Sequence, residues 1–197
     1  MALTSRKRRP LNRTITHLRD TKLFIIATEG EKTEKQYFEM FRNPRAQVKV
    51  IPTQEGKSAP EYVLERLKEF HREYQLTKTD ELWLMIDVDR WQEVKLSQIA
   101  AIAIQKGYYL AVSNPCFELW LCLHLSEANQ LGLTCRDLEA FLRNHSGSYN
   151  KANLRPEVYL LGVNDALRRA KELHSNDQER WPTQTGSHVY KIVEKLL

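Results

Sequence analysis

Three carboxylates in this sequence come directly after two apolar runs that are typical of buried strands. Glu29 follows Lys22–Thr28, and Asp87 and Asp89 follow Glu81–Ile86. Side chains two residues apart in an extended chain point to the same side, so Asp87 and Asp89 can reach one site. Carboxylate oxygens are the ligands that Mg²⁺ prefers, and three converging carboxylates repel one another unless a cation neutralises them. The pattern predicts a site for Mg²⁺, or for Mn²⁺, that supports metal-assisted phosphodiester chemistry.

A plainer explanation exists for each acidic residue in this pattern. An Asp-x-Asp pair is a weak signal by itself, and carboxylates after strands often cap helices. Glu31 or Glu34 would interact favourably with the helix dipole at a helix N-terminus, or would help to position Glu29 without contacting the metal. The loop from Glu29 to Thr33 lacks the GxxxxGK[ST] spacing of a phosphate-binding loop, which disfavours an ATPase of the Walker type.

The carboxylates need a sheet that brings the strand ends to one edge. Short apolar runs predict strands at 22–28, 48–51, 81–86 and 108–112, with helical patterns between them. Strands that alternate with helices favour an α/β fold with a mostly parallel four-stranded sheet, which binds ligands beyond the carboxyl ends of its strands. After Ser113 we expect helices at 116–125, 134–144, 155–174 and 184–197. The first of these segments is apolar nearly all round, so a strand is the alternative there. The predicted parts are a basic arm (1–21), an α/β core (22–125) and a helical C-terminal part packed on the core (126–197).

Charge adds a second functional indication. The 197-residue chain carries a net charge of +5, and its first residues are strongly basic. Such an arm gains affinity for nucleic acid by neutralising phosphates, although a solvated basic terminus is also common. Lys32 and Arg90 flank the carboxylates and are further candidates for phosphate contacts, with surface charge balance as the simpler explanation. The candidate residues of the arm are Arg6, Lys7, Arg8, Arg9 and Arg13.

Three further side chains lie close to the predicted site in sequence. Glu118 interrupts an apolar run, so it is either a fourth metal ligand or support for one, or a helix-edge residue that reaches solvent. Asn114 follows the fourth strand, where it would orient a water or phosphate, or cap the next helix. His124 is a candidate proton shuttle, but a lone histidine on an apolar helix is more often a core residue. No apolar run is long enough for a membrane span, and the three cysteines are expected to be reduced thiols in a cytosolic protein.

Three segments resemble the RloB-like proteins, whose core is similar to the Toprim fold. They are FIIATEGEKTEKQYF (24–38), LMIDVDRW (84–91) and SNPCFELWLCLHL (113–125). The resemblance implies that Glu29 is the acid or base and that Asp87 and Asp89 are magnesium ligands. It also implies a role in bacterial anti-phage defence with an ABC-type ATPase as partner.

The expected function is therefore a Mg²⁺-dependent endonuclease that hydrolyses phosphodiester bonds in DNA or in RNA such as tRNA. The alternative is a non-catalytic Toprim-like subunit that binds nucleic acid or a partner protein. A topoisomerase or primase is disfavoured because the chain has no room for the additional domain that either enzyme needs.

Overall fold

The computed structural model describes residues 21–53, 56–74, 76–88, 91–131, 134–146, 149–174, 176 and 178–197. Two groups of predicted site residues therefore lie outside the described residues: the basic side chains between Arg6 and Arg13, and the pair Asp89 and Arg90. The secondary structure, in chain order, is β1 (Lys22–Thr28), α1 (Thr33–Glu39), β2 (Ala46–Ile51), α2 (Pro60–Glu73), β3 (Glu81–Asp87), α3 (Glu93–Gln105), β4 (Tyr109–Asn114), α4 (Phe117–Leu123), the 3₁₀ turn η1 (Ala128–Gln130), α5 (Cys135–Ser146), α6 (Pro156–Leu160), α7 (Val163–Leu173), β5 (Gly186–Ser187) and α8 (Tyr190–Leu196).

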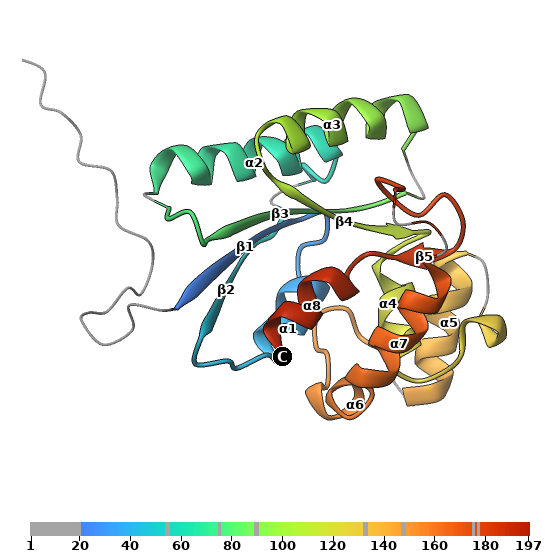
Figure 1. Cartoon of the computed structure of the whole chain (residues 1–197). Coiled ribbons are helices and arrows are strands. Elements are labelled where there is room, and N and C mark those ends of the chain that lie inside the picture. The colour runs from blue at the N-terminus through green and yellow to red at the C-terminus, as the bar shows by residue number, and fades with distance from the viewer. Residues whose placement is uncertain are drawn as a thin grey trace, which may run out of the picture.

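The sheet has the order β2-β1-β3-β4-β5, and its first four strands are parallel (Figure 1). The predicted α/β class and the mostly parallel sheet are confirmed. The fifth strand, β5, was not predicted. It has two residues and pairs antiparallel with the end of β4, through Ser113 with Ser187 and Asn114 with Gly186. Two residues are too few to give an alternating pattern, which is why the sequence predicted a helix over this segment.

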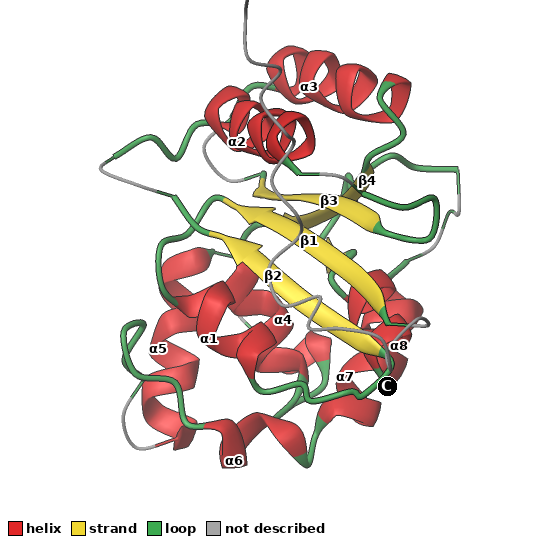
Figure 2. Cartoon of the chain, turned by 90° about the vertical axis from the view of Figure 1, so that its left-hand side faces the viewer, coloured by secondary structure: helices red, strands yellow, loops and turns green. Residues whose placement is uncertain are grey.

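Helices cover both faces of the sheet (Figure 2). Successive strand residues alternate between two apolar clusters, as the period of an extended chain requires. Along β1, Ile25 packs with α2 and α3, whereas Phe24 and Ile26 pack against the opposite layer. That opposite layer contains α1, α4, α5, α7 and α8, so the helices after residue 126 share one core with the sheet. Every residue of α4 is buried, which makes α4 the centre of this layer.

The predicted helix over 155–174 is divided into α6 and α7. The division falls at Gly162, the N-cap of α7, where the chain passes close to the backbone carbonyl of His124. A Cβ atom at this position would overlap the carbonyl oxygen of His124, so only glycine permits the approach. Helical periodicity does not reveal a contact of this kind.

Among the described residues, no helix combines the length and apolar character needed to cross a membrane.

Candidate functional site

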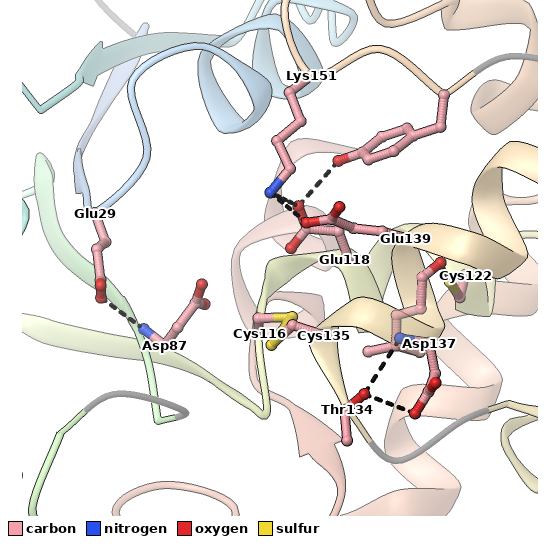
Figure 3. The surroundings of a disulfide bond; sticks show 12 residues. Glu29, Asp87, Cys116, Glu118, Cys122, Thr134, Cys135, Asp137, Glu139 and Lys151 are labelled. Carbon is pink, nitrogen blue, oxygen red and sulfur yellow. Dashed lines mark hydrogen bonds and ion pairs between the residues drawn. A yellow bond between two sulfur atoms is a disulfide. The ribbon is translucent and has the colours of Figure 1, made fainter.

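Glu29 and Asp87 lie together at the carboxyl edge of the sheet. Glu29 follows β1 and is only 9% exposed, and Asp87 is the last residue of the neighbouring strand β3. The backbone N–H of Asp87 donates to Glu29 Oε2 at 3.2 Å (Figure 3). The indole Nε1 of Trp91 donates to both carboxylate oxygens of Glu29, at 3.1 and 3.2 Å. Two fixed donors therefore set the orientation of the Glu29 carboxylate.

Glu34 supports the loop that carries Glu29. Its carboxylate lies under the loop, where Oε1 accepts a hydrogen bond of 2.9 Å from Gly30 N–H. A side chain at residue 30 would overlap this carboxylate, which explains the glycine. The pKa of Glu34 is raised to about 7, chiefly by burial and also by the negative charges of Glu118 and Glu29, against backbone hydrogen bonds that lower it. Glu34 is therefore a buried acid directly behind the site, rather than an exposed residue that only favours a helix dipole.

Arg66 fixes the same loop from the other side of the strand ends. Its guanidinium donates to the carbonyl of Thr28 at 2.8 Å, to Thr53 Oγ1 at 2.8 Å and to the carbonyl of Lys57 at 2.9 Å. It thereby ties the end of β1 to the segment that follows β2. The sequence offered no indication of this role, because Arg66 occupies an ordinary polar position of α2.

Glu118 is held by a lysine and a tyrosine from a distant loop. Its Oε1 accepts from the hydroxyl of Tyr149 at 3.0 Å and lies 2.8 Å from Lys151 Nζ. Lys151 Nζ also lies 2.8 Å from Glu139 Oε1 of α5, and burial raises the pKa of the Tyr149 hydroxyl so that it remains a donor. We call Glu118, Glu139, Tyr149 and Lys151 the Lys151 network. Glu118 is thus a buried carboxylate whose charge is compensated by Lys151.

The loop of the Lys151 network also contacts the helix that follows Glu29. The backbone carbonyl of Lys151 accepts from Thr33 Oγ1 at 3.2 Å and from Gln36 Nε2 at 3.0 Å, and both residues belong to α1. The loop therefore joins α1, α4 and α5 over more than a hundred residues of sequence. Tyr149 and Lys151 were not predicted as site residues, because nothing in their local spacing indicates these long-range contacts.

Asn114 makes a structural contact that the sequence did not predict. Its Nδ2 donates to the carbonyl of Pro182 at 3.0 Å, and its backbone pairs with Gly186 of β5. The helix after it begins at Phe117 with Cys116 as the N-cap, so Asn114 does not cap it. The side chain fastens the 182–186 segment to the end of β4.

His124 is a core residue, which is the more common of the two roles that the sequence allowed, and nothing in its contacts supports a proton shuttle. It is 4% exposed, and both ring nitrogens are in hydrogen bonds, with the Tyr37 hydroxyl at 3.1 Å and the Trp120 carbonyl at 2.9 Å. The carbonyl can only accept, so Nδ1 carries the proton and Nε2 accepts from Tyr37. Burial lowers the pKa of His124 to about 4.

The lowered pKa of His124 predicts an acid-sensitive contribution to stability. The contribution is fully present above the unfolded value of 6.5 and is lost as the pH falls towards 4, since the unfolded chain then takes up a proton that the folded chain refuses. Relative to His124→Gln, the wild type should lose about 3 kcal/mol of unfolding free energy between pH 6.5 and 4 in urea titrations. Glu34 contributes to stability with the opposite pH dependence, and this contribution cancels when the wild type is compared with His124→Gln, since both contain Glu34. His145→Gln, at an exposed position, is the matched control, and parallel profiles for His124→Gln and wild type would contradict the prediction.

Lys32 and Glu31 lie at the entrance to α1, in an open surface hollow. Lys35, Gln36 and Thr53 also line it. The hollow adjoins the loop after Glu29, so Lys32 is placed near the edge where the carboxylates lie.

The described part of the site provides oxygen ligands suited to a hard cation. Glu29 and Asp87 come from adjacent strand ends, and carboxylates are the groups that Mg²⁺ takes from proteins. Within the described residues, no three His, Cys, Asp or Glu side chains come together in a way that could hold a metal ion. Glu118 therefore does not complete a set of three with Glu29 and Asp87 there, and the predicted third ligand, Asp89, lies outside the described residues.

The cysteines depart from the predicted reduced thiols. Cys116 and Cys135 form a disulfide, with their Cα atoms 5.9 Å apart, and Cys122 is free and buried. Cys116 and Cys135 are nineteen residues apart in sequence. The residues around them form no motif that predicts a disulfide.

Comparison with protein families matches the chain to the model of the RloB-like protein over residues 24–196. No curated protein and no solved structure matches the chain.

Proposed function

Because this chain belongs to the RloB-like family, and because its fold brings Glu29 and Asp87 together, we propose that it is a metal-dependent nuclease. The observation that carries the proposal is the Glu29 carboxylate, which two donors hold against the end of β3. A structural acid at a helix start would not require a dedicated indole donor from a segment 62 residues away. The substrate class is nucleic acid, either DNA or RNA such as tRNA.

The residues divide into a metal-binding part and a phosphate-binding part. Asp87 and Asp89 are the proposed ligands of Mg²⁺, with Mn²⁺ as a substitute, and Glu29 is a further ligand or the acid or base. A bound Mg²⁺ would supply charge stabilisation for the reacting phosphate group. Glu29, held by Trp91 and Asp87 N–H, would take or give the proton of the attacking or leaving oxygen. Lys32, with Arg90 and the basic arm, would neutralise neighbouring phosphates.

The cellular setting is part of the same proposal. We expect the protein to act in the cytoplasm in anti-phage defence, together with an ABC-type ATPase. The absence of a phosphate-binding loop in the sequence is consistent with an ATPase supplied by another chain.

Cleavage of a mixed panel of DNA, RNA and tRNA tests the proposal. Each substrate is incubated with Mg²⁺, Mn²⁺ or EDTA, with and without the ATPase partner. We expect metal-dependent cleavage that Asp87→Asn lowers by about 10²-fold or more, since a neutral amide is a poor cation ligand. Glu73→Gln, an exposed carboxylate of α2, is the matched control and should retain full activity.

A second result would reverse the proposal. If no cleavage occurs under any condition, while wild type and Asp87→Asn bind nucleic acid equally, the chain is the non-catalytic binding subunit.

A further inference from the structure

Figure 3 shows the Cys116–Cys135 disulfide to the right of Asp87 and below the Lys151 network. Cys116 is the N-cap of the buried helix α4, and Cys135 is the first residue of α5. Cys116 is 3% exposed and Cys135 is partly exposed, so a thiol reagent meets the disulfide from the α5 side. The separation of the Cα atoms, 5.9 Å, lies within the range that disulfides require.

The backbone next to Cys116 holds the backbone next to Asp87. Val88 N–H donates to two carbonyls at once, those of Ser113 at 2.9 Å and Pro115 at 3.2 Å. Asp87 itself pairs with Ser113 in the parallel register of β3 and β4. Any displacement of Pro115 and Cys116 therefore reaches the peptide that carries Asp87.

On the other side of the disulfide, α5 has its own attachments. Leu138 and Leu142 are fully buried, and Thr134 Oγ1 accepts from Asp137 N–H at the start of the helix. Glu139 is paired with Lys151. We therefore expect α5 to stay folded and packed when the disulfide opens. The effect of reduction falls on Cys116, which loses its covalent attachment to a fixed helix.

We propose that Cys116 and Cys135 are a reversible thiol–disulfide pair that regulates the metal affinity of the Glu29–Asp87 site, with the disulfide form binding the cation more tightly. The inference rests on the proposed function, because it assigns regulation to the same site. A dithiol reductant breaks the Sγ–Sγ bond by exchange, gives two electrons and two protons to form two thiols, and becomes a disulfide itself. Oxidised glutathione reverses the step and is released as two molecules of the reduced tripeptide.

The test compares both redox forms of the full chain. The protein is oxidised with oxidised glutathione or reduced with dithiothreitol. The reagent is then removed under anaerobic conditions, and the free thiols of the protein are counted by mass spectrometry. Mn²⁺ binding is measured by calorimetry, and Val88 N–H exchange by deuterium labelling. In the reduced form we expect about tenfold weaker Mn²⁺ binding and faster exchange of Val88 N–H. A tenfold loss of metal affinity is typical of changes to the groups that hold metal ligands in position. Cys116→Ser and Cys135→Ser should match the reduced form whatever the reagent, whereas Cys122→Ala should keep the redox response.

The outcomes separate this inference from the proposed function. Equal Mn²⁺ affinity and equal Val88 exchange in two forms whose thiol counts differ would overturn the redox inference, and so would a failure to form the disulfide. If neither form binds Mn²⁺ but Val88 exchange depends on the redox form, the metal assignment fails while the coupling between the disulfide and the Asp87 peptide is supported.

Discussion

Replacing Glu29 by glutamine should lower metal-dependent cleavage by about 10³-fold while leaving the fold intact. Glutamine has the same shape, and an amide oxygen in the place of Oε2 still accepts from Asp87 N–H and Trp91 Nε1. Of the three hydrogen bonds described above, only the one from Trp91 Nε1 to Oε1 is lost, because the amide NH₂ takes the place of Oε1. The variant otherwise loses only the negative charge and the proton-accepting group. Initial cleavage rates, with circular dichroism to confirm folding, measure the effect.

Trp91→Phe is a second variant, for which we expect a smaller loss of activity than for Glu29→Gln. It removes the indole N–H that contacts both oxygens of Glu29 but keeps an aromatic ring in the same place. Loss of a group that only orients a metal ligand typically lowers metal affinity or activity 10- to 100-fold. We therefore expect Trp91→Phe to cleave about tenfold more slowly than the wild type, but clearly faster than Glu29→Gln. The control is Glu73→Gln, with unchanged rates. Equal activity of Glu29→Gln and the wild type would remove Glu29 from the chemistry and leave it as a structural acid after β1.

The part of the site that sequence could predict is the part that sheet geometry determines. Apolar runs located β1 and β3, and parallel neighbours must end at one edge, so Glu29 and Asp87 had to approach each other. The burial of α4 followed from its apolar composition in the same way. These features depend on local pattern and on one general rule of topology.

The missing features depend on contacts between distant segments. Lys151 reaches Glu118 from 33 residues away and Glu139 from 12, and Trp91 reaches Glu29 from 62. The partners of His124 are a tyrosine 87 residues away and a carbonyl of its own helix. Side-chain identity does not reveal which of several possible partners packing will choose. The acidic residue at position 118 was therefore recognised as unusual, while its lysine partner was not.

The Lys151 network provides the largest change in stability that we expect from a single substitution at constant pH. Lys151→Met keeps most of the aliphatic stem but removes the charge that faces Glu118, whose side chain is only 8% exposed. Removing one partner of a fully buried ion pair costs about 3–5 kcal/mol. Lys151 itself is 53% exposed, and solvent screening reduces the expected loss of unfolding free energy to about 2 kcal/mol.

A second lysine on the same layer gives the matched control. Lys171 pairs with Glu194, and both side chains are about half exposed, at 47% and 52%. Lys171→Met should therefore cost less than about 1 kcal/mol in urea titrations. Glu118→Gln introduced together with Lys151→Met should recover part of the loss, because a neutral amide is cheaper to bury than a carboxylate without its cation.

The comparison of the two lysines also decides between two roles of Glu118. If Lys151→Met is clearly the more costly variant and Glu118→Gln rescues it, the carboxylate is a buried charge whose counter-ion is Lys151, and its role is to join α4 to α5 and to the loop on α1. If both lysine variants cost the same, Glu118 is solvated well enough to stand without Lys151. A carboxylate in that state could exchange its lysine for a cation, and the sequence-based prediction of Glu118 as a metal ligand would then be the better explanation. Repeating the titrations of Lys151→Met and of the wild type with Mg²⁺ distinguishes the two roles. A cation that binds at Glu118 would stabilise Lys151→Met more than the wild type, whereas a cation that binds at Glu29 and Asp87 would stabilise both equally.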